Sequence, residues 1–195
     1  MARTVASKSD VTRRRIVEEA SAAFREHGIE QVGVRDVMER AGLTRGGFYF
    51  HFADKEALLK ASLQEAAAVS AEVYLQRASN APEGKEIQAL IEAYLSAENR
   101  DHWGAGCLVA ALAGEAGRGD ADQRATFGDA IATIVSTVAK YMPEEEPGQR
   151  MLRAGLLMSS MAGVLMVSRV LPDPAHSDAL LAEARKFYAA NFGAV

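Results

Sequence analysis

The stretch Arg45-Gly-Gly-Phe-Tyr-Phe-His-Phe52 places two adjacent glycines before four aromatic residues, in a chain of 195 residues that is only 7% aromatic. Phe48 and Phe52 are one helical turn apart, so they are predicted to face a hydrophobic core together. Tyr49 and His51 then fall towards the other side of the same short helix. A tyrosine hydroxyl and a histidine ring nitrogen on a surface can both reach a phosphate group. The stretch is therefore predicted to be half core and half contact surface.

The residues before this stretch read as two further helices. The helices of this region are predicted over residues 11–27, 34–41 and 45–51. Gly28 and Gly42 are the expected stops of the first two, and Thr44 is the expected cap of the third. Two short helices joined by a glycine-containing turn have the proportions of a helix-turn-helix, whose second helix enters the DNA major groove. Gly46 lacks bulk there, so close contact with DNA would explain the ~1 kcal/mol that a glycine costs a helix.

The rest of the chain also reads as helix, because no run alternates apolar and polar residues as a strand would. Asp54 is predicted to cap a helix that reaches the late 70s, and residues 79–84 form a break after it. Further helices are predicted from about residue 87 and over residues 106–117, 121–141, 149–171 and 177–192. The expected fold is all-α with about nine helices, divided into a three-helix unit (residues 1–53) and a larger helical domain (residues 54–195) that includes helix 54–78 as the connector.

Charge is distributed unevenly along the chain, whose net charge is −4. Residues 1–60 carry 11 Lys and Arg against 9 Asp and Glu, whereas residues 61–195 carry 11 against 17. The run Arg13-Arg14-Arg15 contributes to a net charge of +4 over the first fifteen residues. A basic end on an acidic body is expected where one end meets a polyanion. An N-terminal arm that reaches the DNA backbone or minor groove and a solvated helix start are both compatible with this run.

The cysteine count and the hydropathy favour a cytoplasmic protein with no membrane partner. Cys107 is the single cysteine, which excludes an internal disulfide framework and fits a reducing compartment. The N-terminus has no apolar signal core. The most apolar segment, residues 151–171, has 15 uncharged residues between Arg153 and Arg169, fewer than the ~20 that a membrane span needs. We therefore expect this segment to be a buried helix.

The segment Gly42-Leu-Thr-Arg-Gly-Gly-Phe-Tyr-Phe-His-Phe-Ala-Asp-Lys-Glu-Ala-Leu58 resembles the recognition-helix signature of TetR family transcriptional regulators. The spacing of Ala20, Phe24 and Gly28 and the run Val34-Arg-Asp-Val-Met-Glu-Arg-Ala41 resemble the first two helices of that family. The resemblance covers about residues 12–60, and beyond residue 60 only the all-helical layout agrees. One departure is Gly33, where the family usually has a Ser or Thr that caps the second helix.

The resemblance implies a homodimeric, non-enzymatic regulator, most often a repressor, whose two N-terminal domains bind adjacent major grooves of a palindromic operator. It also implies that a small-molecule inducer in the C-terminal domain changes their separation and releases the double-stranded DNA. The DNA contacts that it implies by motif position are Arg35, Thr44, Arg45, Gly46, Tyr49, His51 and Lys55. Of these, Arg35 and Lys55 would contact phosphate. The alternatives are an activator, and a small-molecule-binding protein or enzyme with a vestigial helix-turn-helix.

Cys107 lies in the run Trp103-Gly-Ala-Gly-Cys-Leu-Val109. A lone cysteine is most often a small buried hydrophobic residue. The alternative function is a thiol that senses electrophiles or oxidants, which requires a lowered pKa and access. The Gly-Cys-Leu run resembles a subset of the TetR family, some of whose members respond to reactive compounds. The sequence alone places no cation beside this thiol.

Residues that suit an adaptable pocket between helices are predicted to line the ligand site. These are Trp103, Cys107, Phe127 and Met158. The four histidines show no metal-ligand spacing, and the sequence indicates neither a metal nor a cofactor.

The dimer interface is predicted from small residues that allow helices to approach closely. Gly155, Ser159 and Gly163 repeat at i, i+4 and i+8. Helices 121–141 and 149–171 of two chains would then form a four-helix bundle.

Overall fold

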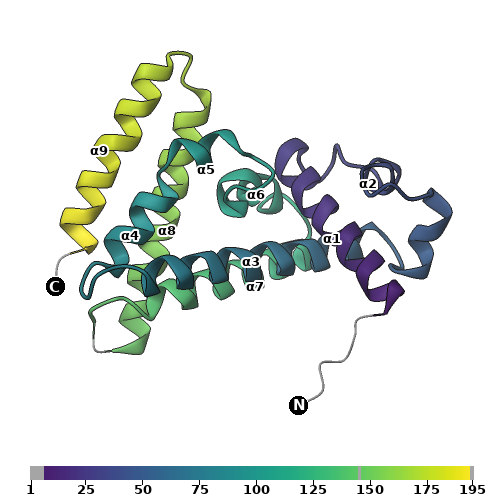
Figure 1. The fold of residues 1–195 in the computed structure, drawn as a ribbon, viewed down its shortest axis with the longest axis horizontal. Coiled ribbons are helices and arrows are strands. Elements are labelled where there is room, and N and C mark those ends of the chain that lie inside the picture. Colours follow the sequence, from purple (N-terminus) through teal and green to yellow (C-terminus); the bar gives the residue numbers. More distant parts are fainter. Residues whose placement is uncertain (1–6, 145, 194–195) are drawn as a thin grey trace.

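The computed structural model describes residues 7–144 and 146–193, and within these ranges the chain is helical and contains no strand. The elements are α1 (Lys8–His27), α2 (Val34–Arg40), η1 (Arg45–Phe50), α3 (Lys55–Ser79), α4 (Glu86–Tyr94), α5 (Ala97–Asp101), α6 (Leu108–Ala116), α7 (Ala121–Ala139), α8 (Pro147–Val170) and α9 (Pro174–Phe192). Figure 1 shows α3 and α7 side by side along the molecule, with α1 and α2 at one end and α8 and α9 at the other. The all-α prediction is confirmed, and only the short α5 was not expected.

Helix α1 begins three residues before the predicted start, because Ser7 and Asp10 form a capping box. The Ser7 hydroxyl accepts a hydrogen bond from the Asp10 amide (3.1 Å), and the Asp10 carboxylate accepts one from the Ser7 amide (3.0 Å). These bonds to Ser7 lower the pKa of the Asp10 carboxyl. The helix ends as predicted at Gly28, whose φ of 87° lies in the region that favours glycine.

The stretch that begins at Arg45 forms a 3-10 helix rather than the predicted α-helix. The two glycines provide a physical reason, because they weaken the α-helical state and a short 3-10 segment needs fewer residues in register. Thr44 is the N-cap residue with extended backbone angles, as predicted, but its side chain makes no capping hydrogen bond. Its carbonyl instead accepts a hydrogen bond from the Gly47 amide at 3.0 Å.

Aspartate caps three other helices, α3, α7 and α9. Asp54 accepts a hydrogen bond from the Ala57 amide at 2.7 Å and so starts α3 where the sequence predicted it.

Helices α8 and α9 start two and three residues before the predicted positions, because Pro147 and Pro174 occupy the first helical turn. A proline there loses no hydrogen bond, since the first amides of a helix have no partner within the helix. The helix bounds predicted from the sequence, 149–171 and 177–192, leave both prolines in the preceding loops.

One continuous hydrophobic core runs through the described part of the chain, from Ile16 in α1 to Phe192 in α9. Helix α8 contributes Leu157, Met161 and Leu165 to it. By length and apolar composition α8 could cross a membrane, a pattern that core helices of soluble proteins share. The prediction of a buried helix is confirmed for the inner face of α8 only, because the outer face exposes a stripe of apolar residues. We call Leu152, Leu156, Met166, Val167 and Val170 the α8 stripe.

Candidate nucleic-acid interface and ligand cavity

A tight turn joins α2 to η1 and sets the direction in which η1 is presented. Gly42 has a φ of 67°, and the Leu43 amide donates to the Met38 carbonyl at 2.8 Å. A side chain at position 42 would be strained by this angle. Its Cβ would also lie 3.1 Å from a nitrogen of the Arg15 guanidinium, which covers the turn. The backbone angle therefore favours glycine at this predicted helix stop, whereas the exposed Arg15 side chain could move to make room.

The residues of the 45–52 stretch divide between core and surface as predicted. Phe48 and Phe52 are buried, and their rings stack with centroids 5.7 Å apart. Tyr49 is 65% exposed, and its ring meets the edge of Phe48 at 5.3 Å, so a core residue orients it. The surface next to Tyr49 includes the exposed Thr44, Arg45 and Gly46, whereas His51 is half-buried.

Phe50 is the candidate contact that the sequence reasoning missed. Its side chain is 89% exposed, more than any other large apolar side chain among the described residues. The helical period could have revealed it, because a residue midway between Phe48 and Phe52 must point away from the core. An apolar group so exposed on this surface is suited to contact with a thymine methyl group or a sugar.

The two residues predicted to contact phosphate have partners within the chain. Arg35 is exposed and pairs with Glu39 on the same face of α2 at 2.7 Å. Lys55 is half-buried, and its ammonium donates to the Ile29 carbonyl at 2.6 Å. An ammonium has three donors, so this bond orients Lys55 and leaves donors for a phosphate. Neither prediction is tested by these contacts.

The run Arg13-Arg14-Arg15 lies inside α1 rather than in an arm, and all three residues are exposed. Residues 1–6, which would form the arm, lie outside the described ranges. The Arg13 guanidinium stands over the Phe52 ring, 4.8 Å from its centroid. Part of this positive charge therefore lies against the helix-turn-helix.

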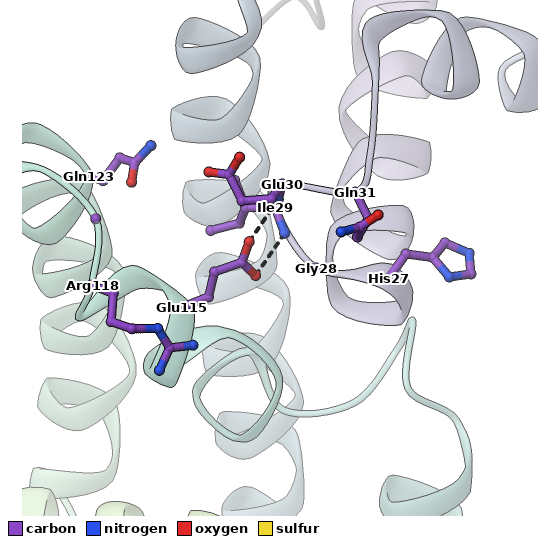
Figure 2. Close-up of a pocket in the computed structure, with 9 residues that line it drawn as sticks. His27, Gly28, Ile29, Glu30, Gln31, Glu115, Arg118 and Gln123 are labelled. Carbon is purple, nitrogen blue, oxygen red and sulfur yellow. Dashed lines mark hydrogen bonds between the residues drawn. The ribbon is translucent and has the colours of Figure 1, made fainter.

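A carboxylate of α6 holds the loop that follows α1 (Figure 2). Glu115 accepts hydrogen bonds from the Ile29 amide at 2.9 Å and the Glu30 amide at 2.7 Å. A Cβ at Gly28 would lie 3.0 Å from the same carboxylate, so glycine allows the approach. We call this contact the Glu115 clamp. It links α6 directly to the N-terminal helices.

A cavity of about 580 Å³ lies where α1, α3, α4 and the segment before α6 meet. Its walls include the buried rings of Tyr74 and Tyr94 and the side chains of Arg25 and Cys107. The Tyr94 hydroxyl donates to the Cys107 sulfur at 2.8 Å. Burial raises the pKa of both tyrosines well above the ordinary value.

Of the four residues predicted to line a ligand pocket, only Cys107 borders this cavity. Trp103 is 42% exposed, lines a separate hollow beside α1, and lies under the Arg169 guanidinium, 4.6 Å from the ring centroid. Phe127 and Met158 are packed in the core. The role of all four in ligand binding remains a prediction.

A helix-turn-helix that presents a tight second helix beside a basic face defines the class of DNA-binding regulators. The family model of the bacterial regulatory proteins, tetR family, matches residues 16–62. Over these residues the chain is similar to the TetR family of transcriptional regulators.

Curated relatives share the N-terminal region with this chain. The A-factor receptor protein of Streptomyces griseus is 41% identical over 54 residues, which are 28% of this chain and 20% of that protein. The HTH-type transcriptional repressor AcnR of Corynebacterium diphtheriae is 44% identical over 71 residues, or 35% of this chain and 37% of that protein. These matches span well under half the length of either relative.

Solved structures share the fold of nearly the whole chain. The reduced form of Escherichia coli NemR superposes with a TM-score of 0.77 at 17% identity, over 93% of this chain and 97% of that one. A TetR family regulator from Cytophaga hutchinsonii has a TM-score of 0.77 at 21% identity, over 96% and 98%. At these identities the likeness concerns the fold alone.

Proposed function

We propose that the protein is a DNA-binding transcriptional repressor that binds a palindromic operator as a homodimer and is released by a small organic ligand. Residues 1–53 bind DNA in this proposal. Residues 54–195 bind the ligand and form the dimer, with helix 54–78 as connector. The observation that carries the proposal is the two-sided 45–52 stretch, which buries Phe48 and Phe52 while Tyr49 and Phe50 stay exposed.

Each face of the motif has a distinct task in DNA recognition. Arg45, Tyr49 and His51 contact the DNA through charge, hydroxyl and ring nitrogen, while Thr44 and Gly46 let the backbone approach. Phe50 adds an apolar contact in the major groove. Phosphate contacts from Arg35 and Lys55 position the domain. Because neutralised phosphates release the counterions condensed on the DNA, binding falls as the salt concentration rises.

The α8 stripe supports dimerisation through α7 and α8. Leu152 and Leu156 are 76% and 58% exposed, and five large apolar residues share this face of one helix. A stripe of this length on a surface helix indicates an interface. The outer face of α7 carries small residues such as Gly128 and Ala132, which allow close helix packing.

Selection of bound fragments from random DNA tests the proposal. A dyad-symmetric site should emerge, and the affinity for it should fall at least tenfold in Tyr49→Ala and Arg45→Ala. Lys140→Ala, which removes an exposed cation at the C-cap of α7, should bind as the parent does. A selection that enriches no sequence would discard the DNA-binding function and leave a small-molecule-binding protein.

A further inference from the structure

Arg25 places a cation in the wall of the cavity without a carboxylate partner. Its Nε donates to the Ser21 carbonyl at 3.1 Å and its Nη1 to the Gly106 carbonyl at 3.1 Å. Among the described residues no carboxylate forms an ion pair with Arg25; the charge of the adjacent Glu26 acts on it, but the Glu26 carboxylate pairs with Arg40 at 2.7 Å. Burial disfavours the charged form and lowers the pKa of Arg25. Such a cation is stabilised by an anion that enters the cavity.

A second guanidinium lies near the same point. Arg169 donates to the carbonyls of Arg100 and Asn99 at 3.1 and 2.9 Å, and its Nη1 is buried with no hydrogen-bond partner among the described residues. Arg25 and Arg169 both lie close enough to Cys107 to interact electrostatically with its sulfur. Two guanidinium groups therefore lie near Cys107 at this end of the cavity, and Glu98 is the one carboxylate among its lining residues.

The rest of the cavity is suited to an apolar body. The rings of Tyr74 and Tyr94 lie 6.5 Å apart, centre to centre, in its wall. Val69 and Val73 at its rim are 51% and 43% exposed, although they are apolar residues of a long packed helix. A ligand that covers these valines would remove apolar surface from water.

We propose that this cavity binds an organic carboxylate with an apolar or aromatic body, whose head group pairs with Arg25. The planar guanidinium matches a carboxylate in a two-point geometry. Arg25 belongs to α1 and bonds the Gly106 carbonyl just before α6, so a carboxylate that competes for Arg25 changes the contact between these two helices. This regulatory consequence rests on the proposed function.

Cys107 makes the charge preference of the cavity measurable with two probes of nearly equal size. Iodoacetate and iodoacetamide both alkylate a thiol: sulfur bonds the methylene carbon, iodide leaves, and the thiol proton goes to buffer. Because Cys107 is the single cysteine, intact mass reports its labelling alone. The ratio of the iodoacetate rate to the iodoacetamide rate should be at least tenfold higher in the folded protein than in the urea-unfolded chain. An equal or lower ratio, or no labelling by either reagent, would overturn the proposal.

The source of the preference is tested by Arg25→Met, with the exposed rim residue Arg77→Met as matched control. Arg25→Met should bring the folded ratio to within about threefold of the unfolded one, and Arg77→Met should retain it. A retained preference in a folded Arg25→Met protein would overturn the pairing with Arg25. If that variant does not fold, the parent protein's ratio still decides the charge preference.

The two adducts then test regulation. Carboxymethylation of Cys107 tethers an anion beside Arg25, and carbamidomethylation attaches a neutral group of the same shape. Only the carboxymethyl adduct should weaken binding to the selected operator, by at least tenfold. Equal effects of both adducts would refute coupling through Arg25. Failure of the unmodified protein to bind any operator would instead refute the proposed function. The labelling ratio would still test whether the cavity prefers an anion.

Discussion

Removing the Glu115 clamp should destabilise the protein by about 2 kcal/mol. Glu115→Ala deletes two hydrogen bonds to backbone amides. Bonds to a charged group contribute about 1.5–3 kcal/mol each, and the lower end applies because Glu115 is half-buried and solvent screens it. Part of that sum is recovered when water reaches the freed amides of Ile29 and Glu30. For a chain of this size, 2 kcal/mol corresponds to a fall in Tm of about 4–8 °C.

The assay is thermal unfolding followed by circular dichroism, with guanidinium unfolding for the free energy. Glu115→Gln should lose at least about half of the stability that Glu115→Ala loses. Its side-chain amide keeps one acceptor oxygen but turns an NH₂ group towards the other backbone amide donor. Glu183→Ala is the control, because Glu183 forms an exposed pair with Lys186 and its loss should cost under about 0.5 kcal/mol. A Glu115→Ala protein with a Tm within about 1 °C of the parent would refute the clamp as a structural link.

Four further outcomes are expected. Phe50→Ala should leave the Tm unchanged, because the side chain is 89% exposed, and should weaken operator binding about tenfold in a mobility-shift assay, the equivalent of about 1.4 kcal/mol; unchanged binding would remove this contact. Leu156→Glu should give a monomer in sedimentation experiments while Phe187→Glu, of similar exposure on α9, should stay dimeric, and a dimeric Leu156→Glu would move the interface elsewhere. Cys107→Ser should keep operator binding and its release by organic carboxylates, whereas loss of release would favour the thiol sensor. Burial raises the pKa of Tyr94, so its neutral form contributes stability below about pH 10 that is lost as pH rises further. The Tm of Tyr94→Phe should therefore fall less between about pH 9 and 11 than the Tm of the parent. An equal fall in both proteins would contradict this assignment.

Local signals in the sequence were sufficient for most of the fold. The glycine at position 28, the aspartate at position 54 and the apolar spacing of Phe48 and Phe52 act within one helical turn, so they can be read without tertiary information. The same local logic misjudged Pro147 and Pro174, since a proline before a helix and a proline in its first turn look alike in sequence.

Contacts between distant residues could not be predicted in this way. Arg25 and Gly106 are 81 positions apart, and Glu115 and Ile29 are 86 apart. In the sequence Arg25 resembles any surface arginine of a helix. Only the packing of α1 against α6 in the fold places it beside Cys107. For the same reason the sequence predicted one cavity residue, Cys107. Phe127 and Met158 are packed in the core, and the side chain of Trp103 lies outside the cavity although its neighbours His102 and Gly104 line it.

The length of α3 turns a small change in the cavity into a large one at the DNA. Tyr74 borders the cavity and Lys55 begins the same helix, 19 positions earlier. At a rise of 1.5 Å per residue this separation is about 28 Å. If α3 moves as a rigid rod about the position of Tyr74, a tilt of only about 4° displaces Lys55 by about 2 Å. Such leverage means that a ligand need not reshape the protein to misalign two recognition elements with successive turns of a duplex.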